Sequence, residues 1–452
     1  MSLRPKPLIE PPQSQSATRI STFNSTPFKG IIALGTPFEE RNMKSIHNKV
    51  RSVIAAIVCV FCTLALIPTH NAYASVNSFT RIAGNTRYET MSQIVEQAFP
   101  TSSEYAVLAA GSNFPDALAA SSLAGAYNAP IILTDSYSLS SEASFEMQRL
   151  GVRKVFIIGG QSAISADVEQ SIRQIQSSME IERIAGSTRY DTALQIYNAL
   201  TSSNTRSQAS KVAIIATGNS FADALSISPY AYQTSSPFFL SSPSGLDPDS
   251  LQILESGAFN SVIIAGGTAA VPQHVQTNLE ALGINVTRLS GGTRYETSKS
   301  IGEFVLNNLN SAPQDVVFAT GSNFPDALAG SALSGSKKTA MLLVQDSNSP
   351  TIDFAAQNIS SAQNVYVLGG KNAVNSSTLN AIARAYGLGD QESEPQPPAP
   401  QPTPQPNPQV GTHDAGEFCK KADVGKVEYA KNGRLIVCEY RNNNKTPHWH
   451  YV

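Results

Sequence analysis

The chain has 452 residues, of which 41% are hydrophobic and 15% are charged, and its formal net charge at pH 7 is −2. This length accommodates two to four domains, and the hydrophobic fraction is that of an ordinary globular protein. A charge so close to neutral argues against a nucleic-acid-binding protein, because such proteins usually carry a clear excess of Lys and Arg.

The N-terminal region has the pattern of a secretory signal peptide. A basic segment at residues 44–51 precedes an apolar run at 52–67, and the small-residue pattern Ala72-Tyr73-Ala74 follows. The apolar run is short for a membrane span. We therefore expect a signal peptide at 43–74 that starts at Met43 and is cleaved after Ala74, and hence a secreted protein.

The preceding residues, 1–42, are polar and rich in Pro, and they are unusual in front of a signal peptide. We interpret them as a non-native or disordered extension that results from a start codon placed too early. A long N-terminal region of the signal peptide is the alternative.

Three phrases recur along the rest of the chain, always in the same order. The first phrase is RIAGNTRYET at 81–90, RIAGSTRYDT at 183–192 and RLSGGTRYET at 288–297. The second is AAGSNFPDALA at 109–119, ATGNSFADALS at 216–226 and ATGSNFPDALA at 319–329. The third is IIGGQSAIS at 157–165, IAGGTAAVP at 264–272 and VLGGKNAVN at 367–375. The period of roughly 105 residues is too long for a solenoid and suits a small domain. We therefore predict three modules, at about 79–180, 181–285 and 286–388.

Within the first module, helical patterns alternate with short apolar runs. Helices are predicted at 87–98, 114–127, 140–150 and 165–176, the last with a good start at Ser165 and Asp167. Buried strands are predicted at 105–111, 130–135 and 154–160, which are apolar without alternation. This order predicts an α/β module, with a parallel sheet covered by helices on both faces.

Arginine is concentrated in the first phrase. Residues 79–388 contain eleven arginines, and six of them are in this phrase: Arg81, Arg87, Arg183, Arg189, Arg288 and Arg294. Guanidinium groups bind phosphate or carboxylate in a planar, bidentate manner. The repeated pair is therefore a candidate site for anionic groups on a polymer. The alternative is a structural ion pair within or between modules, such as Arg87 with Glu89 or Asp116 and the equivalents in the other modules.

The second phrase supplies three candidate carboxylates, Asp116, Asp223 and Asp326. Each follows a strand and falls in the first turn of a predicted helix, where a negative charge favours the helix dipole and Pro is tolerated. A plain helix start explains most of this pattern. The phenylalanines at 114, 221 and 324 are interpreted as core residues, with a sugar-stacking surface as the alternative.

The third phrase ends a strand with a Gly-Gly pair, at 159–160, 266–267 and 369–370. Ligands of open α/β sheets often bind at such strand ends. Dinucleotide binding is rejected, because the GxGxxG spacing and the downstream acidic residue are missing. The modules contain a single histidine, His274, and no cysteine, so a Ser/His/Asp or metal hydrolase is poorly supported. We expect no cofactor and no metal; a glycosidase that uses a carboxylate pair stays open.

A Pro/Gln-rich linker at 390–410 leads to a small C-terminal domain at 411–452. Cys59 and Cys62 lie in the predicted signal peptide, which leaves Cys419 and Cys438 in the mature chain. Two closely spaced cysteines in an exported domain predict a disulfide rather than a metal site. The only tryptophan, Trp449, lies between two histidines and is interpreted as a core residue, with a metal or sugar contact as the alternative.

The three phrases resemble those of the cell wall binding type 2 repeat family, over about 79–388 in three copies. Departures are Leu289 and Ser290 for Ile-Ala, Ala222 for Pro, and Asp191 for Glu. The resemblance implies Rossmann-like or Toprim-like modules packed in threes about a pseudo-threefold axis. It also implies attachment of a surface protein to the Gram-positive wall through an anionic, teichoic-acid-like or other secondary wall polysaccharide.

From this we expect a secreted, wall-associated protein that anchors itself without catalysis, and that binds neither nucleic acid nor, once the signal is cleaved, a membrane. Two alternatives stay open. The chain could be a modifier subunit of a wall hydrolase, or an adhesin that acts through 411–452.

Overall fold

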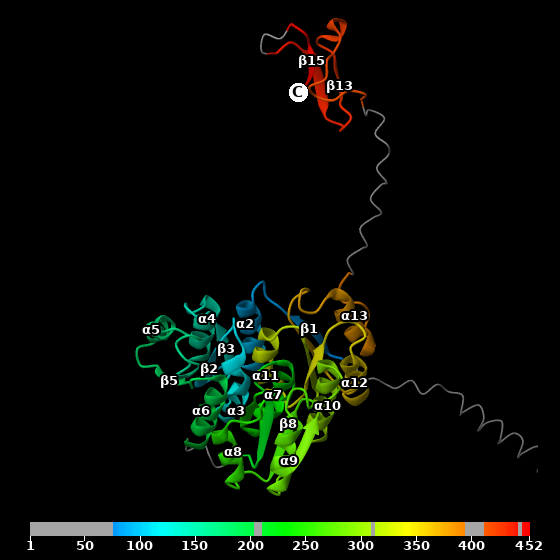
Figure 1. Ribbon diagram of the computed structural model, residues 1–452. Coiled ribbons are helices and arrows are strands. Elements are labelled where there is room, and N and C mark those ends of the chain that lie inside the picture. The colour runs from blue at the N-terminus through cyan, green and yellow to red at the C-terminus, as the bar shows by residue number, and fades with distance from the viewer. Residues whose placement is uncertain (1–75, 203–209, 309–311, 394–410, 442–444) are drawn as a thin grey trace, which may run out of the picture. The chain divides into compact units, whose positions relative to one another are not determined.

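The computed structural model describes residues 76–202, 210–308, 312–393, 411–441 and 445–452 (Figure 1). The predicted N-terminal extension and signal peptide, with Cys59 and Cys62, lie outside the described residues. So do residues 394–410, most of the predicted linker. Within the described ranges, no helix has the length and apolar character needed to cross a membrane.

The first sheet contains four parallel strands in the order β3-β2-β4-β5. Its strands are β2 (Tyr105–Ala110), β3 (Ile131–Thr134), β4 (Lys154–Ile158) and β5 (Glu180–Ile184). The helices are α2 (Arg87–Ala98), η1 (Pro115–Ala119) running into α3 (Ala120–Ala126), α4 (Ser141–Leu150) and α5 (Ala166–Ile175). The α/β class, three of the four strands and all four helical segments were predicted from the sequence. Ser165 is the N-cap residue of α5, although its side chain does not cap the helix.

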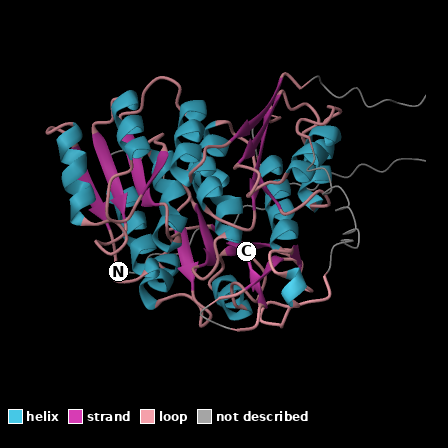
Figure 2. Ribbon diagram, turned by 90° about the horizontal axis from the view of Figure 1, so that it is seen from above, coloured by secondary structure: helices cyan, strands magenta, loops and turns pink. Residues whose placement is uncertain are grey.

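The second and third sheets repeat this topology, in the orders β7-β6-β8-β9 and β11-β10-β12-β1. The second contains β6 (Val212–Thr217), β7 (Phe238–Ser241), β8 (Ser261–Ala265) and β9 (Asn285–Leu289), with α6 (Arg189–Ser202), α7 (Ala222–Thr234), α8 (Pro248–Glu255) and α9 (Gln273–Ala281). The third contains β10 (Asp315–Thr320), β11 (Met341–Val344), β12 (Asn364–Leu368) and β1 (Ser78–Ile82), with α10 (Arg294–Asn307), α11 (Pro325–Ser336), α12 (Pro350–Asn358) and α13 (Ser376–Ala385). Figure 2 shows the helices packed alongside the strands of each module.

Each sheet is completed by a strand from the following sequence repeat. The first phrase of the second repeat forms β5, which pairs with β4, and that of the third repeat forms β9, which pairs with β8. The first phrase of the first repeat forms β1, which pairs with β12 at the other end of the array. The three modules therefore close into a ring, and the sequence repeats are offset by one strand from the sheets.

The helices that follow the second phrase meet at the centre of the ring. Helices α3, α7 and α11 pack against one another, and buried Ser121 and Ser331 share a hydrogen bond of 3.1 Å. Tyr232 of α7 lies so close to α3 that a Cβ atom on Gly125 would be 1.9 Å from its carbonyl oxygen. One hydrophobic core runs through all three modules. Contacts this close require glycine, so the modules are packed as one body.

The rings of Phe114, Phe221 and Phe324 form a triangle, with centroid separations of 5.5, 5.5 and 6.1 Å. They are contributed by equivalent positions of the three modules. They therefore mark the pseudo-threefold axis.

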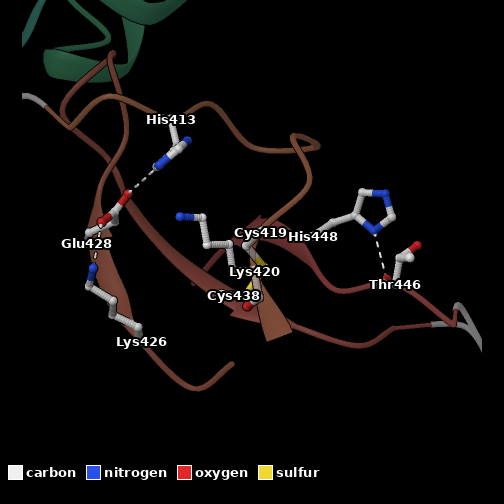
Figure 3. The surroundings of a disulfide bond; sticks show 8 residues. All are labelled: His413, Cys419, Lys420, Lys426, Glu428, Cys438, Thr446 and His448. Atoms are coloured by element: carbon white, nitrogen blue, oxygen red, sulfur yellow. Dashed lines mark hydrogen bonds and ion pairs between the residues drawn. A yellow bond between two sulfur atoms is a disulfide. The ribbon is translucent and has the colours of Figure 1, made fainter. Parts of the chain in front are cut away.

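The C-terminal domain is a three-stranded antiparallel sheet in the order β13-β14-β15. Its elements are η3 (Lys421–Asp423), β13 (Val427–Tyr429), β14 (Leu435–Glu439) and β15 (His448–Tyr451). The expected disulfide joins Cys419 to Cys438, whose Cα atoms are 6.0 Å apart (Figure 3). Trp449 is 2% exposed and packs in a small core with Cys438, and the His413 ring stacks on it. The interpretation of Trp449 as a core residue thus agrees with the structure.

The opposite face of this small sheet has no core packed on it. The strand register places Val427, Val437 and His450 on that face. Val427 is 52% exposed, and Leu435 is 43% exposed on the same side. The same register places Glu439 and His448 on this face, so its exposed apolar side chains lie beside polar ones.

Candidate functional site

The second and third phrases meet where the strand order of each sheet reverses. In the first module β2 lies between β3 and β4, so the chain leaves β2 toward one side and β4 toward the other. Phrase two follows β2 and phrase three follows β4. The carboxyl ends of two such strands border the crevice in which open α/β sheets bind their ligands. The third-phrase signal in the sequence therefore lies at the place expected for a ligand site.

Much of the first phrase is explained by its local structure. Thr86 caps α2 by accepting a hydrogen bond from the backbone of Glu89, and Thr293 with Glu296 forms a complete capping box on α10. Gly84 donates its amide to the Thr90 hydroxyl. The repeated tyrosine covers the glycine that ends the second strand, since a Cβ atom on Gly111 would be 2.6 Å from the Tyr88 ring. These residues recur because the same helix N-terminus is formed in each of the three modules.

The first arginine of each phrase holds the Gly-Gly turn of the preceding module. Arg81, Arg183 and Arg288 donate to the carbonyl oxygens of Gly369, Gly159 and Gly266 at 2.6, 2.9 and 3.0 Å. Ion pairs at this level join Arg81 to Glu392 and Arg183 to Glu169. All three guanidinium groups thus donate within the fold, although the buried Nη2 atom of Arg288 has no hydrogen-bond partner among the described residues. The structure thus places these three candidate residues in the framework of the site.

The second arginine is used only in part. Arg87, Arg189 and Arg294 each donate through Nη1 to the carbonyl of the glycine that ends the second strand of their own module, at 2.5, 2.6 and 2.7 Å. The side chains of Arg87 and Arg294 are exposed, and that of Arg189 is half-buried. The predicted ion pair of Arg87 with Glu89 does not form, because Glu89 accepts hydrogen bonds from Asn85.

The repeated aspartates lie against the Gly-Gly turns. A Cβ atom on Gly159, Gly266 or Gly369 would be within 2.9 Å of the Oδ2 atom of Asp116, Asp223 or Asp326, respectively. The same three glycines have φ of +100°, +116° and +100°, a region that strongly favours glycine. The first glycine of each pair is therefore required both by the backbone and by the aspartate.

The second glycine of each pair has no such requirement. Gly160 and Gly370 have no atom within 4 Å of a Cβ position, and Gly267 has only the Ser290 Cβ at 3.9 Å. None of the three has a positive φ. A side chain here would extend into open space rather than into the protein. Glycine at this position leaves the floor of the crevice bare.

The arginine of one module acts on the aspartate of its neighbour. Burial raises the pKa of Asp223, and the charge of Arg294 in the third module partly opposes the shift. Burial raises the pKa of Asp326 to about 6, and the charge of Arg87 in the first module opposes it. At the remaining junction α6, which begins at Arg189, packs against η1, which contains Asp116. The candidate residues of neighbouring modules thus lie together at the junctions, and the charges that act on Asp223 and Asp326 come from the next module.

A cavity of about 400 Å³ opens at the junction of the second and third modules. Its lining combines all three phrases, with Asp223 from the second, Gly267 from the third, and Gly292, Thr293 and Arg294 from the next first phrase. Arg294 also lies over the Phe221 ring, 5.5 Å from the centroid. Phe114 and Phe221 are half-buried and Phe324 is 8% exposed, so the phenylalanines serve mainly as the apolar centre between the junctions.

Chemically, each junction offers a partly free guanidinium, a neighbouring carboxyl and a bare backbone turn. This arrangement suits charged groups on an extended ligand, since it combines a cation with close backbone approach. In the described part of the chain, no group of three or more His, Cys, Asp or Glu side chains is placed to hold a metal ion. The sequence left an interaction between modules open, but it could not indicate that Arg87 acts on Asp326, because only the closed ring brings these two phrases together.

Three segments of the chain match the family model described as cell wall binding domain 2 (CWB2): residues 81–169, 183–276 and 288–379. The chain therefore belongs to the cell wall binding domain 2 family.

Two relatives come from Bacillus subtilis. N-acetylmuramoyl-L-alanine amidase LytC is 30% identical over 345 residues, which are 74% of this chain and 66% of the relative. An amidase enhancer is 28% identical over 313 residues, 69% of this chain and 41% of the relative. The chain thus spans less than two thirds of the length of either protein.

Two solved structures from Clostridium difficile share the fold. Cwp6 has a TM-score of 0.61 at 22% identity, over 71% of this chain and 49% of that one. Cwp8 has a TM-score of 0.61 at 24% identity, over 69% of this chain and 52% of that one. The three-module α/β architecture is thus shared with solved relatives, and the family assigns the chain to the cell wall.

Proposed function

We propose that the chain anchors itself to the Gram-positive wall without catalysis, by binding an anionic secondary wall polymer in the three crevices between its modules. The observation that carries this proposal is the second glycine of each Gly-Gly pair. It is kept in all three copies although neither backbone conformation nor packing requires it. A bare turn beside an exposed arginine fits a ligand that comes close to the backbone.

Arg87, Arg189 and Arg294 are the residues that contact the polymer in this proposal. Each gives one donor to a backbone carbonyl, which fixes the position of the guanidinium. A guanidinium fixed in this way is preorganised to bind phosphate or carboxylate through its other nitrogens. Arg81, Arg183 and Arg288 support the same crevices by holding the Gly-Gly turns.

Three crevices on one ring make the binding multivalent. Once one segment of polymer is bound, the next site experiences a high effective concentration, which can raise avidity by about 10² or more without any new contact. A protein released slowly from the wall in this way needs no covalent link. Its localisation is then secreted and wall-associated, with Ser75 expected at the mature N-terminus in mass spectrometry.

The experiment compares two triple variants with a charge-matched control. One variant carries Arg→Gln at 87, 189 and 294, and the other carries Gly→Leu at 160, 267 and 370. The control carries Arg→Gln at 153, 173 and 384, which removes the same charge from exposed arginines elsewhere. Sedimentation with purified walls at several salt concentrations measures binding, and circular dichroism measures thermal stability.

We expect both site variants to fold and to be released from walls, and the control to bind like the wild type. Charge-assisted hydrogen bonds contribute roughly 1.5–3 kcal/mol each. The arginine variant loses three of them, so its binding should weaken much more than that of the control, which loses only the same net charge. Wild-type binding should also weaken with salt. Normal binding by a folded arginine variant would refute the polymer site and leave these arginines as framework residues.

A second candidate function is that of a modifier of a wall hydrolase. The similarity to an amidase enhancer favours it, and the open apolar face of the C-terminal sheet offers a contact surface for a protein. Loss of turbidity of purified walls with an added amidase would reveal this role. Deleting 411–452 would abolish a modifier or adhesin role that depends on the C-terminal domain, and would leave anchoring intact.

A further inference from the structure

The junction of the third and first modules combines a buried carboxyl with an exposed guanidinium. Asp326 lies in the first turn of α11, against the turn at Gly369. Arg87 lies at the start of α2, close enough for its charge to act on Asp326, but the two form no ion pair. An anion that binds Arg87 must therefore approach the Asp326 carboxyl as well.

We propose that polymer binding at this junction is coupled to the uptake of one proton by the Asp326 carboxyl. This inference rests on the proposed function, because it concerns the regulation of the same site. An ionised carboxylate repels an incoming phosphate or carboxylate, whereas the neutral acid can donate a hydrogen bond to it. Protonation thus turns an opposing group into a favourable one.

The surroundings of Asp326 make the coupling local. Of the elements packed on α11, α2 contributes Arg87, whose charge acts on Asp326. Behind the Gly369 turn lies Arg81 of β1, which is paired with Glu392. Lys371 lies beyond, on the other oxygen of Glu392. The same packed elements also carry carboxylates: Glu89 and Glu96 of α2, Asp223 of α7 and Asp315 of β10. Burial already raises the pKa of Asp326 to about 6 in the free protein. A bound anion raises this pKa further, so by linkage a lower pH must strengthen binding.

The size of the effect follows from the linkage. If the bound anion raises the pKa by about one unit, binding tightens by about tenfold as the pH falls through the two pKa values. The change should be centred between pH 5.5 and 7.5, on the order of the free value and one unit above it.

The test uses the full chain, purified Gram-positive walls as the probe, and two variants. Asp326→Asn makes the site permanently neutral. Asp353→Asn removes one exposed carboxylate of α12, outside the candidate site residues, and serves as the matched control. Dissociation constants are measured from about pH 5 to 8, and folding is checked at each pH by circular dichroism. Every variant keeps the histidines of the C-terminal domain, so differences between variants report the carboxyl.

For pKa values of about 6 in the free and 7 in the bound protein, we expect wild type and Asp353→Asn to bind about sixfold tighter at pH 5.5 than at pH 7.5. Asp326→Asn should bind at pH 7.5 as tightly as wild type at pH 5.5, with a flat profile. A pH dependence that persists in Asp326→Asn, or that disappears equally in Asp353→Asn, would overturn the inference and leave the proposed function standing. Absence of wild-type binding at every pH would instead overturn the proposed function, and this inference with it.

Discussion

Replacing Asp326 by Asn should stabilise the protein at neutral pH, which is unusual for a change in a repeated motif. The folded pKa of about 6 lies above the ordinary aspartate pKa of 3.8, because burial penalises the charged form. Below about pH 4 both the folded and the unfolded states are protonated and no penalty exists. As the pH rises through the window from about 4 to 6, the folded state must give up a proton that it holds more tightly, so stability falls.

The magnitude follows from the difference of about two pKa units, each worth about 1.4 kcal/mol, which sets an upper limit of about 3 kcal/mol. Part of the carboxyl is exposed, and its charge also favours the N-terminus of α11 by about 0.3–1 kcal/mol, which Asn loses. We therefore expect Asp326→Asn to raise the free energy of unfolding by about 1–2 kcal/mol at pH 7.5 and to leave it unchanged at pH 4.

Urea denaturation followed by far-UV circular dichroism at the two pH values measures this difference. A gain of the same size at both pH values would mean that the amide simply packs better. A loss at pH 7.5 would mean that the ionised carboxylate stabilises the fold, and the reasoning about its burial would be wrong.

Three further predictions concern the ring and the C-terminal domain. Arg81→Met removes the donor to two carbonyl oxygens and to a carboxylate, and should lower the free energy of unfolding by about 2–4 kcal/mol in urea denaturation. The exposed control Arg173→Met should lower it by under about 0.5 kcal/mol. Equal effects of the two variants would show that Arg81 does not hold β1. Gly125→Ala should cost about 3 kcal/mol or more, whereas Gly160→Ala in open space should be close to neutral; a tolerated Gly125→Ala would contradict the close packing of α3 on α7. Reduction of the disulfide should destabilise the C-terminal domain by about 2–4 kcal/mol, measured by the fluorescence of Trp449, the sole tryptophan. The unfolding transition of the ring, measured by circular dichroism, should not change. A shift of both transitions would show that the C-terminal domain and the ring unfold together.

The elements inside each module were predictable because their signals are local. The helix predicted at 87–98 begins and ends at the predicted residues, Arg87 and Ala98. Its N-cap and its apolar spacing are signals that lie within a few residues of each other. The strands at 105–111 and 154–160 are short apolar runs between turn residues, and they appear as β2 and β4 with slightly shorter bounds. Parallel strands buried on both faces have this composition.

The strands formed by the first phrase were not predicted, because their sequence lacks the continuous apolar composition of a strand that is buried on both faces. β5 and β9 expose their first residue and bury only their last, as edge strands do, so no continuous apolar run marks them. Nor can a sequence indicate that β1 pairs with β12, nearly three hundred residues later, because that contact is set by the closure of the ring. The pairing of a strand of one repeat with the sheet of its neighbour depends on tertiary structure, and a local sequence pattern cannot predict it.

The same closure explains why the two arginines of the phrase have different roles. The phrase first runs as an edge strand of one module, and there Arg81, Arg183 or Arg288 holds that module's Gly-Gly turn. It then turns at a glycine and starts the first helix of the next module, where the second arginine meets the aspartate of the module just left. Each crevice therefore has one wall from each of two modules. Under the proposed function, a single module has no complete crevice, and three repeats closed into a ring would supply three binding crevices where an open array of three would supply two.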